Sequence, residues 1–228
     1  MTTDAEKAEL FAYYQAQAAN YEDFYDGKGQ AIAALSGEYA TDTAGVTTLL
    51  SSFGRGDVVD LACGTGFWLS VYGGNAASIT LVDQSEQALA HCERRLQNLG
   101  LAAVARIVRG DVFNVPLDEA RYDACMLGFL LSHLTSAETD ALLGRVRTVL
   151  RPTSELAVID SVWSDARKPY RQRDGFERRS LADGRSFSIR KKYYDRPELE
   201  SLLSRHGFAT RSVYSGNVFI AMLAQRAR

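Results

Sequence analysis

Three carboxylates and one glycine-rich loop are spaced along this chain in a way that suits the binding of a small polar ligand. Asp60 closes a hydrophobic run, and Gly64 and Gly66 follow it directly. Asp83 and Asp111 each come at or just after the end of a later hydrophobic run. Glycines after a strand let a ligand approach the backbone, and a carboxylate can accept hydrogen bonds from two hydroxyl groups at once. Asp83 lies 23 residues after Asp60, about the spacing at which an acid reaches the ribose hydroxyls of a nucleotide.

The loop is poorly suited to phosphate groups. A dinucleotide-binding turn has a third glycine where this chain has Leu69, and the loop contains no Lys or Arg. The Gly-Lys-Ser/Thr ending of a P-loop is also absent. Together with Asp60, these features favour a ligand that carries an ammonium group and disfavour an NAD-dependent oxidoreductase. Each single acid could also serve only to cap the helix that follows it.

Alternating strands and helices are expected to bring these acids together. Apolar periodicity predicts helices at residues 85–99 and 136–150, and hydrophobic runs predict strands at residues 58–61, 78–82, 103–109, 122–127 and 156–160. The alternation predicts the α/β class, as a doubly wound, mostly parallel sheet with helices on both faces. In such sheets ligands bind at the carboxyl ends of the strands near the switch point, which is where the three acids should lie.

Composition limits the classes of partner and compartment. The chain has 228 residues, 46% hydrophobic residues and a formal net charge of -2, so no general attraction to nucleic acid or to an anionic membrane is expected. No signal peptide and no apolar run of about 18 residues is visible. The three cysteines form no CxxC pair, so we expect no metal site. We expect a single cytoplasmic domain, residues 1–228, that is a monomer or a homodimer.

Four segments, in this order, resemble the motifs of class I S-adenosylmethionine-dependent methyltransferases. Residues 59–66 are similar to the glycine-rich motif, residues 81–85 and 109–112 to the next two ligand-binding motifs, and residues 122–128 to the fourth motif, which borders the acceptor site. The resemblance covers roughly residues 45–160. It implies a Rossmann-like sheet of seven strands, and the last two, expected at residues 208–213 and 218–223, would form an antiparallel hairpin.

The same resemblance implies S-adenosyl-L-methionine as the cofactor and assigns residues to its parts. Asp60 would lie near the ammonium group, Asp83 would hold the ribose, and Asp111 would take the exocyclic amine of the adenine. Relatives often carry an Arg where this chain has Gln17, so the partner of the cofactor carboxylate is open, with Tyr14 and Tyr21 as candidates. The full set of expected cofactor-binding residues is Tyr14, Tyr21, Asp60, Ala62, Gly64, Gly66, Asp83, Gln84, Asp111, Val112 and Leu127, with Leu127 below the sulfonium.

Two further segments could enclose an acceptor. Residues 4–26 predict an amphipathic helix rich in aromatic side chains, followed by helical pieces at 33–39 and 43–53. The aromatic residues either pack this helix onto the body or make residues 1–40 a lid. Residues 161–195 form a long basic insertion, in which Asp183 and Gly184 between alternating runs predict a β-hairpin at residues 176–181 and 185–193. This hairpin is either a solvated protrusion or a cap in which Tyr170, Arg171 or Arg178 meets an anionic acceptor.

The predicted activity is methyl transfer from S-adenosylmethionine to N, O or C of a small-molecule acceptor, in secondary metabolism. His133 and Tyr14 are the candidate catalytic residues, and His133 is the side chain after the fourth strand that could take a proton near neutral pH. A histidine in an apolar run is alternatively a packed, hydrogen-bonded residue. Two other functions remain open: a non-methylating enzyme that releases methylthioadenosine, and a non-catalytic module that senses the cofactor.

Overall fold

A seven-stranded sheet forms the centre of the computed structural model, which describes residues 3–29 and 31–227. The strand order is β3-β2-β1-β4-β5-β9-β8. β1 to β5 are parallel, and β9 lies antiparallel between β5 and β8, so the predicted fold class is confirmed. The strands are β1 (Gly56–Leu61), β2 (Ala76–Asp83), β3 (Ala105–Arg109), β4 (Tyr122–Gly128), β5 (Leu150–Ser161), β8 (Phe208–Ser215) and β9 (Phe219–Arg226).

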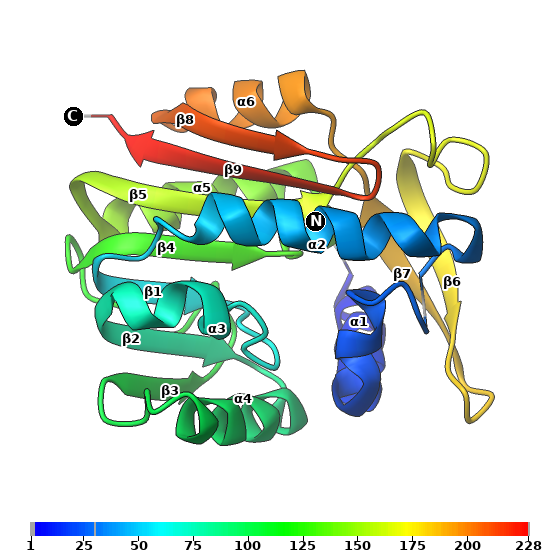
Figure 1. Ribbon diagram of the computed structural model, residues 1–228, viewed down its shortest axis with the longest axis horizontal. Helices are drawn as coiled ribbons and strands as arrows, with labels where there is room; N and C mark the ends of the chain where they lie inside the picture. The colour runs from blue at the N-terminus through cyan, green and yellow to red at the C-terminus, as the bar shows by residue number, and fades with distance from the viewer. Residues whose placement is uncertain (1–2, 30, 228) are drawn as a thin grey trace.

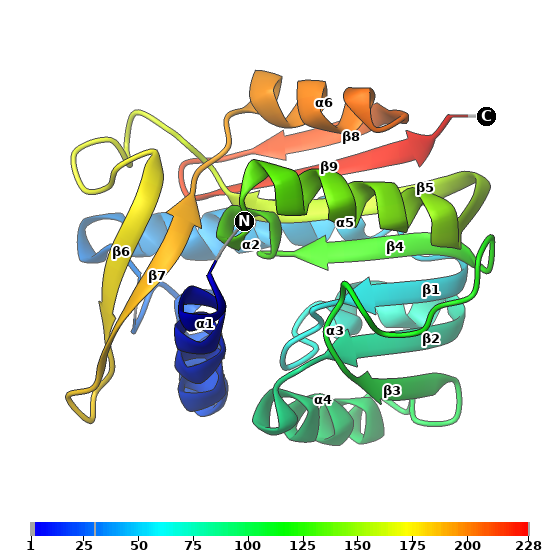
Figure 2. The ribbon, with the colours of Figure 1, turned by 180° about the vertical axis from the view of Figure 1, so that it is seen from behind.

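Helices cover both faces of the sheet because successive side chains of each buried strand point to opposite faces. Val59 packs with the core under α5 (Ser136–Val149) and α6 (Arg196–Arg205), whereas Val58 packs with the core under α2 (Ser36–Leu50) and α4 (Glu86–Asn98). Figure 1 shows α2 in front of the sheet, and Figure 2 shows α5 on the other side. The strand order reverses between β1 and β4, which places a switch point at the end of β1.

The N-terminal segment differs from its prediction. The expected single helix over residues 4–26 is an α-helix, α1 (Asp4–Gln17), that continues as a 3₁₀ helix, η1 (Ala18–Phe24). The tighter winding of three residues per turn brings Tyr21 and Phe24 onto one face. The pieces expected at 33–39 and 43–53 are instead a 3₁₀ turn, η2 (Ala33–Leu35), and the continuous α2.

Two short helices were also mispredicted. The apolar segment after the glycine loop predicts a helix from Phe67 onward, but the structure has only one turn there, α3 (Leu69–Tyr72). α6 was not predicted, although its start carries a recognisable signal. The Asp195 side chain accepts a hydrogen bond from the backbone N–H of Glu198, and a proline lies in the first turn. No helix in the described part of the chain is both long and apolar enough to cross a membrane.

The predicted hairpin is confirmed as a separate two-stranded sheet of β6 (Asp174–Ser180) and β7 (Ser186–Lys192). It lies beside α1 in both ribbon views (Figures 1 and 2). The Glu9 carboxylate accepts a hydrogen bond from the backbone N–H of Ser188 at 2.6 Å, and the rings of Tyr13 and Phe187 meet edge to face. The hairpin therefore packs on the N-terminal helix and does not protrude alone into solvent.

Candidate functional site

The loop after β1 turns through left-handed backbone conformations. Ala62, Gly64 and Gly66 have φ values of 59°, 56° and 72°. A Cβ on Gly66 would lie 2.6 Å from Leu69 Cδ1 and 2.8 Å from Cys92 Sγ, so this glycine is required for packing α3 and α4 against the loop. A Cβ on Gly64 would meet nothing within 4 Å, and its backbone N–H donates to the Asp83 carboxylate at 2.9 Å.

A cavity of about 220 Å³ lies at the carboxyl ends of β1, β2 and β4. It is lined by most of the residues that the sequence predicts as cofactor contacts: Tyr14, Tyr21, Asp60, Ala62, Gly64, Asp83, Gln84, Asp111 and Val112. Gly66 and Leu127 do not line it. Gly66 packs against Leu69 and Cys92, and Leu127 is fully buried in the core on the α5 side. Because side chains alternate along β4, Met126 and Gly128 face the cavity in place of Leu127.

Asp60 is the most deeply placed acid of the cavity. Its side chain accepts a hydrogen bond from the Tyr72 hydroxyl at 2.6 Å, and no basic side chain of the described residues forms an ion pair with it. Burial raises the pKa of Asp60 to about 7, and the nearby Asp83 carboxylate adds to this rise. An ammonium group placed here would offset both effects, so Asp60 suits a cationic ligand.

Asp83 and Asp111 retain acceptor capacity toward the cavity. One oxygen of Asp83 accepts a hydrogen bond from the backbone N–H of Ser85 at 2.8 Å, and the other oxygen accepts one from the backbone N–H of Gly64. A carboxylate has about four acceptor positions, so hydroxyl groups can still bind to it. Asp111 lies at the exposed rim, where its oxygens accept from the Phe113 N–H at 3.0 Å and the Asn114 side chain at 2.9 Å.

The N-terminal segment closes over this cavity and is fastened to it by Glu22. Both oxygens of the Glu22 carboxylate accept from one terminal nitrogen of Arg95 on α4, at 2.6 and 2.7 Å, and one of them also accepts from the Thr65 hydroxyl in the glycine loop at 2.9 Å. Tyr25 stacks on Phe67 with ring centroids 3.8 Å apart. The aromatic residues of this segment therefore pack on the body and line the cavity together.

His133 and Tyr14 meet at the inner end of the cavity. His133 follows β4 in a 3₁₀ turn, η4 (Leu131–His133), and is 4% exposed. Its Nδ1 lies 2.7 Å from the Arg190 carbonyl oxygen, which can only accept, so Nδ1 carries the proton. Nε2 lies 2.6 Å from the Tyr14 hydroxyl and, in the neutral ring, accepts a hydrogen bond from it. Burial, with the positive charge of Lys191, holds the pKa of His133 well below its usual 6.5.

A second, smaller cavity of about 40 Å³ lies behind this pair. Four residues line both cavities and form the wall between them: Tyr14, Tyr21, Phe129 and His133. Basic side chains of the insertion face the smaller cavity, namely Arg167, Arg171, Arg179 and Lys191. Gln17 also faces this cavity and not the larger one.

Of the three residues predicted to meet an acceptor, the structure places only Arg171 at the smaller cavity. Tyr170 is 45% exposed, and Arg178 is exposed on the outer face of β6. Side chains alternate along a strand, so Arg179 points inward where Arg178 points outward. Arg179, one residue after the predicted Arg178, therefore faces the smaller cavity.

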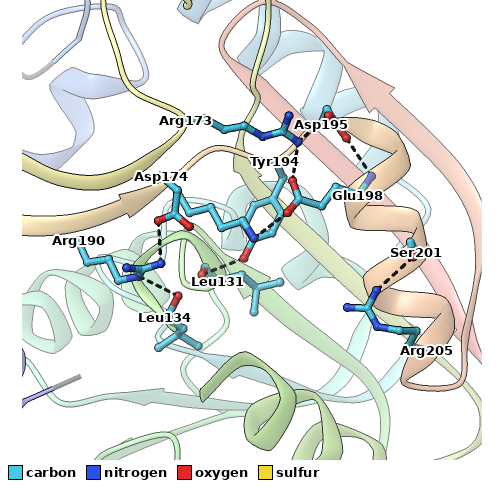
Figure 3. A network of polar contacts seen from close by, with 11 residues as sticks. Leu131, Leu134, Arg173, Asp174, Arg190, Tyr194, Asp195, Glu198, Ser201 and Arg205 are labelled. Carbon is cyan, nitrogen blue, oxygen red and sulfur yellow. Dashed lines mark hydrogen bonds and ion pairs between the residues drawn. The ribbon is translucent and has the colours of Figure 1, made fainter. Parts of the chain in front are cut away.

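Polar contacts hold the hairpin and the His133 segment in place (Figure 3). Arg190 donates to the Leu134 carbonyl oxygen and pairs with Asp174 at 2.7 Å, while its own carbonyl oxygen receives His133 Nδ1–H. At the base of the hairpin, Arg173 bridges Asp195 and Glu198 at the start of α6. The described residues contain no cluster of three or more His, Cys, Asp or Glu side chains that could hold a metal ion.

Residues 58–153 match the family described as "Methyltransferase domain". The curated 2-phytyl-1,4-naphtoquinone methyltransferase of Synechococcus elongatus is 30% identical over 106 residues, which is 45% of this chain and 45% of that protein. The match thus spans less than half the length of this relative. A solved complex of DhpI with SAM and HEP is similar at a TM-score of 0.76 and 25% identity, over 98% of this chain and 99% of that one.

Residues 58–153 are thus similar to a methyltransferase domain, and the whole chain has the fold of the DhpI complex. A further solved structure, the 1,6-didemethyltoxoflavin-N1-methyltransferase of Burkholderia thailandensis with bound 1,6-didemethyltoxoflavin and S-adenosylhomocysteine, has the same fold at a TM-score of 0.65 and 18% identity, over 100% of this chain and 92% of that one. The region that matches the family model contains the glycine loop and the three acids. Neither the N-terminal segment nor the hairpin lies in it.

Sequence reasoning missed three residues that line or fasten the two cavities. Glu22, Arg167 and Lys191 carry no local signal, because each acquires its position only when the N-terminal segment or the insertion docks on the body. The aromatic run around Tyr21 indicated that residues near Glu22 mattered, but it did not single out the acid. The family motifs also stop before Arg167 and Lys191.

Proposed function

We propose that this protein transfers the methyl group of S-adenosylmethionine to N, O or C of a small-molecule acceptor. The observation that carries the proposal is the shared wall of Tyr14, Tyr21, Phe129 and His133, which separates a cavity with acids and a glycine loop from a second, smaller cavity. A methyl group leaving the first cavity through this wall would enter the second. No observation favours the non-methylating alternative.

The residues of the larger cavity fit S-adenosylmethionine, which supplies an electrophilic methyl group on a sulfonium. Asp60 has the buried, cation-free carboxylate that the ammonium group needs, and Asp83 has free acceptor positions for the ribose hydroxyls. Asp111 and Val112 lie where the adenine is expected. The DhpI complex contains SAM in the same fold, which supports this assignment.

Tyr14 and His133 would position the acceptor and take up its proton. Neutral His133 presents Nε2 toward the wall, where it holds the Tyr14 hydroxyl. An acceptor O–H or N–H that displaces this hydroxyl could give its proton to Nε2, and Nδ1–H would remain fixed on the Arg190 carbonyl. The aromatic wall would keep water out and hold the reacting atoms in line at about 3 to 3.5 Å.

We further propose a single domain of residues 1–228, with residues 1–40 as the lid and residues 161–195 as the cap. A cytoplasmic monomer or homodimer that acts in secondary metabolism, with neither nucleic acid nor membrane as partner, agrees with the balanced charge of -2.

The test is a product assay with S-adenosylmethionine that carries a deuterated methyl group. The protein is incubated alone and then with a metabolite extract, and products are measured by mass spectrometry. We expect S-adenosylhomocysteine and a deuterated product only with extract. Asp83→Ala should weaken cofactor affinity by about 5- to 150-fold, because the ribose contacts are lost. Methylthioadenosine release without extract would contradict methyl transfer.

A further inference from the structure

The smaller cavity holds an unusual concentration of buried positive charge. Arg167 is 2% exposed, Lys191 6% and Arg179 9%, and Arg171 lies beside them. Arginine and lysine are almost never this deeply buried unless they are paired, because removing a charge from water is costly. The partners of these four side chains therefore indicate which kind of ligand the cavity can bind.

Two carboxylates face these four basic groups. Glu177 pairs with Arg179 at 2.7 Å and approaches Arg171 at 3.4 Å, and it also accepts the Tyr193 hydroxyl. Asp160 lies 3.6 Å from the Lys191 ammonium. The four basic groups thus exceed the two acids by two positive charges.

Asp160 pairs with Lys191 at 3.6 Å, and its two oxygens also accept backbone hydrogen bonds. They accept the backbone N–H groups of Ser132 at 2.9 Å and Ser161 at 2.7 Å. Lys191 in turn donates to the Ser132 hydroxyl at 2.7 Å. The ammonium group therefore has donor capacity left toward the cavity.

Arg167 is the least neutralised of the four. One of its terminal nitrogens donates to the Val218 carbonyl oxygen at 2.7 Å, and the guanidinium lies over the Tyr193 ring at 4.5 Å. Its Nε is buried and has no hydrogen-bond partner, and no acid of the described residues pairs with it. A buried, unpartnered donor on a cationic group is a strong site for an oxyanion.

We propose that this cavity binds an oxyanion group of the methyl acceptor, phosphoryl or carboxylate, an inference that rests on the proposed function. The volume of about 40 Å³ admits little more than one such group. The rest of the acceptor then lies at the wall of Tyr14, Tyr21, Phe129 and His133, with its reacting atom toward the cofactor cavity. The substrate class is therefore a small acid, and the excess of two positive charges favours the dianionic phosphoryl group.

The site also explains how His133 remains a usable base beside so many cations. Burial, together with the positive charges of Lys191 and Arg179, lowers the pKa of His133, so the ring stays neutral. A bound oxyanion would neutralise these charges and raise the affinity of Nε2 for a proton. The groups that face the ring are Tyr14, the Arg190 carbonyl and these two cations. Binding of the acceptor would thus strengthen the base that its own reaction needs.

The test uses the full chain saturated with S-adenosylhomocysteine, so that no turnover occurs. Binding of inorganic phosphate, acetate and neutral acetamide is measured by calorimetry at constant ionic strength with chloride. We expect phosphate or acetate to bind and acetamide not to bind, and the tighter of the two anions identifies the group. Binding of neither anion, or equal binding of acetamide, would overturn the inference.

Substitutions of the basic residues test whether the anion binds in the smaller cavity. Arg167→Gln and Lys191→Gln should weaken anion binding by about 10- to 100-fold, because a charged hydrogen bond is lost. Arg185→Gln, at the hairpin turn where Arg185 pairs with Asp183, is the matched control and should change nothing. If Arg167→Gln does not fold, Arg171→Gln replaces it, since that side chain is 27% exposed. Anion binding that all these variants leave unchanged would place it elsewhere and refute the proposal.

Two readouts separate this inference from the function on which it rests. If S-adenosylhomocysteine itself does not bind, the proposed function fails. If it binds and the anions do not, only the acidic acceptor is excluded. Phosphate should also raise the pKa of His133, observed by NMR of the ring nitrogens, whereas an anion bound at the outer surface would leave the ring unchanged.

Discussion

At the scale of single residues, Asp60 links cofactor binding to pH. Its pKa of about 7 means that the side chain loses its charge as the pH falls through neutrality. The neutral form attracts the cofactor ammonium less, so we predict that affinity for S-adenosylmethionine falls by about tenfold between pH 8 and pH 6. Calorimetry across this range measures the change.

Two variants test whether Asp60 is the cause. Asp60→Asn should bind weakly and without this pH dependence. Tyr72→Phe removes the hydrogen bond that favours the ionised carboxylate, so the midpoint should move to higher pH. Wild-type affinity that is constant from pH 6 to pH 8 would refute the role of Asp60.

His133 has a defined proton position that can be observed without any substrate. The Arg190 carbonyl requires a proton on Nδ1, and the lowered pKa keeps Nε2 free of one. We predict that ring ¹⁵N signals report the neutral Nδ1–H form throughout pH 6 to 8. Tyr14→Phe should shift the Nε2 signal alone, because it removes the donor to that nitrogen. A titration midpoint near 6.5 would contradict the assignment.

The sequence predicts the positions of the three acids well, but it predicts poorly which basic side chains face the smaller cavity. The difference has a physical reason. Asp60, Asp83 and Asp111 follow hydrophobic runs of period and length typical of strands, so their common edge follows from parallel topology. The orientation of Arg178 and Arg179 depends on hairpin register, which a one-residue shift inverts. Burial of Arg167 depends on docking of the whole insertion, for which no local pattern exists.

At the scale of elements, the glycine loop has two separable requirements. Gly66→Ala forces a Cβ against Leu69 and Cys92 at a left-handed φ, so we predict a loss of about 2 to 5 kcal/mol in the free energy of unfolding. Gly64→Ala meets no neighbour and should cost only about 1 kcal/mol.

The effects of the two substitutions on cofactor binding should have the opposite order from their effects on stability. Gly64 lines the cavity and Gly66 does not, so Gly64→Ala should weaken binding of S-adenosylhomocysteine more than Gly66→Ala does. Urea unfolding and calorimetry on both variants give the two measurements. Equal effects of both substitutions on stability would show that packing at Gly66 was misjudged.

The lid should depend on Glu22. Glu22→Gln weakens the ion pair with Arg95 and the contact with Thr65, so we predict faster hydrogen exchange in η1 and a several-fold faster release of S-adenosylhomocysteine. Asp26→Asn, which removes an exposed pair with Lys28, is the control and should behave as wild type. Unchanged exchange in Glu22→Gln would mean that aromatic packing alone holds the lid.

At the scale of the whole molecule, we propose that cofactor binding and acceptor choice depend on different parts of the chain. The region that matches the family, residues 58–153, contains the glycine loop, the three acids and His133. Arg167, Arg171, Arg179 and Lys191 all lie beyond it, and Tyr14 and Tyr21 precede it. The wall between the cavities is therefore assembled from both parts, which explains why the motifs predicted the cofactor but not the acceptor.

A crystal structure of the protein with S-adenosylhomocysteine tests the central claim most directly, since that claim concerns the position of sulfur relative to the wall. We predict that the amino group lies against Asp60, the ribose hydroxyls against Asp83, and the sulfur toward Tyr14 and His133, facing the smaller cavity. A sulfur directed away from that wall, or a ligand bound outside the larger cavity, would contradict methyl transfer between the two cavities.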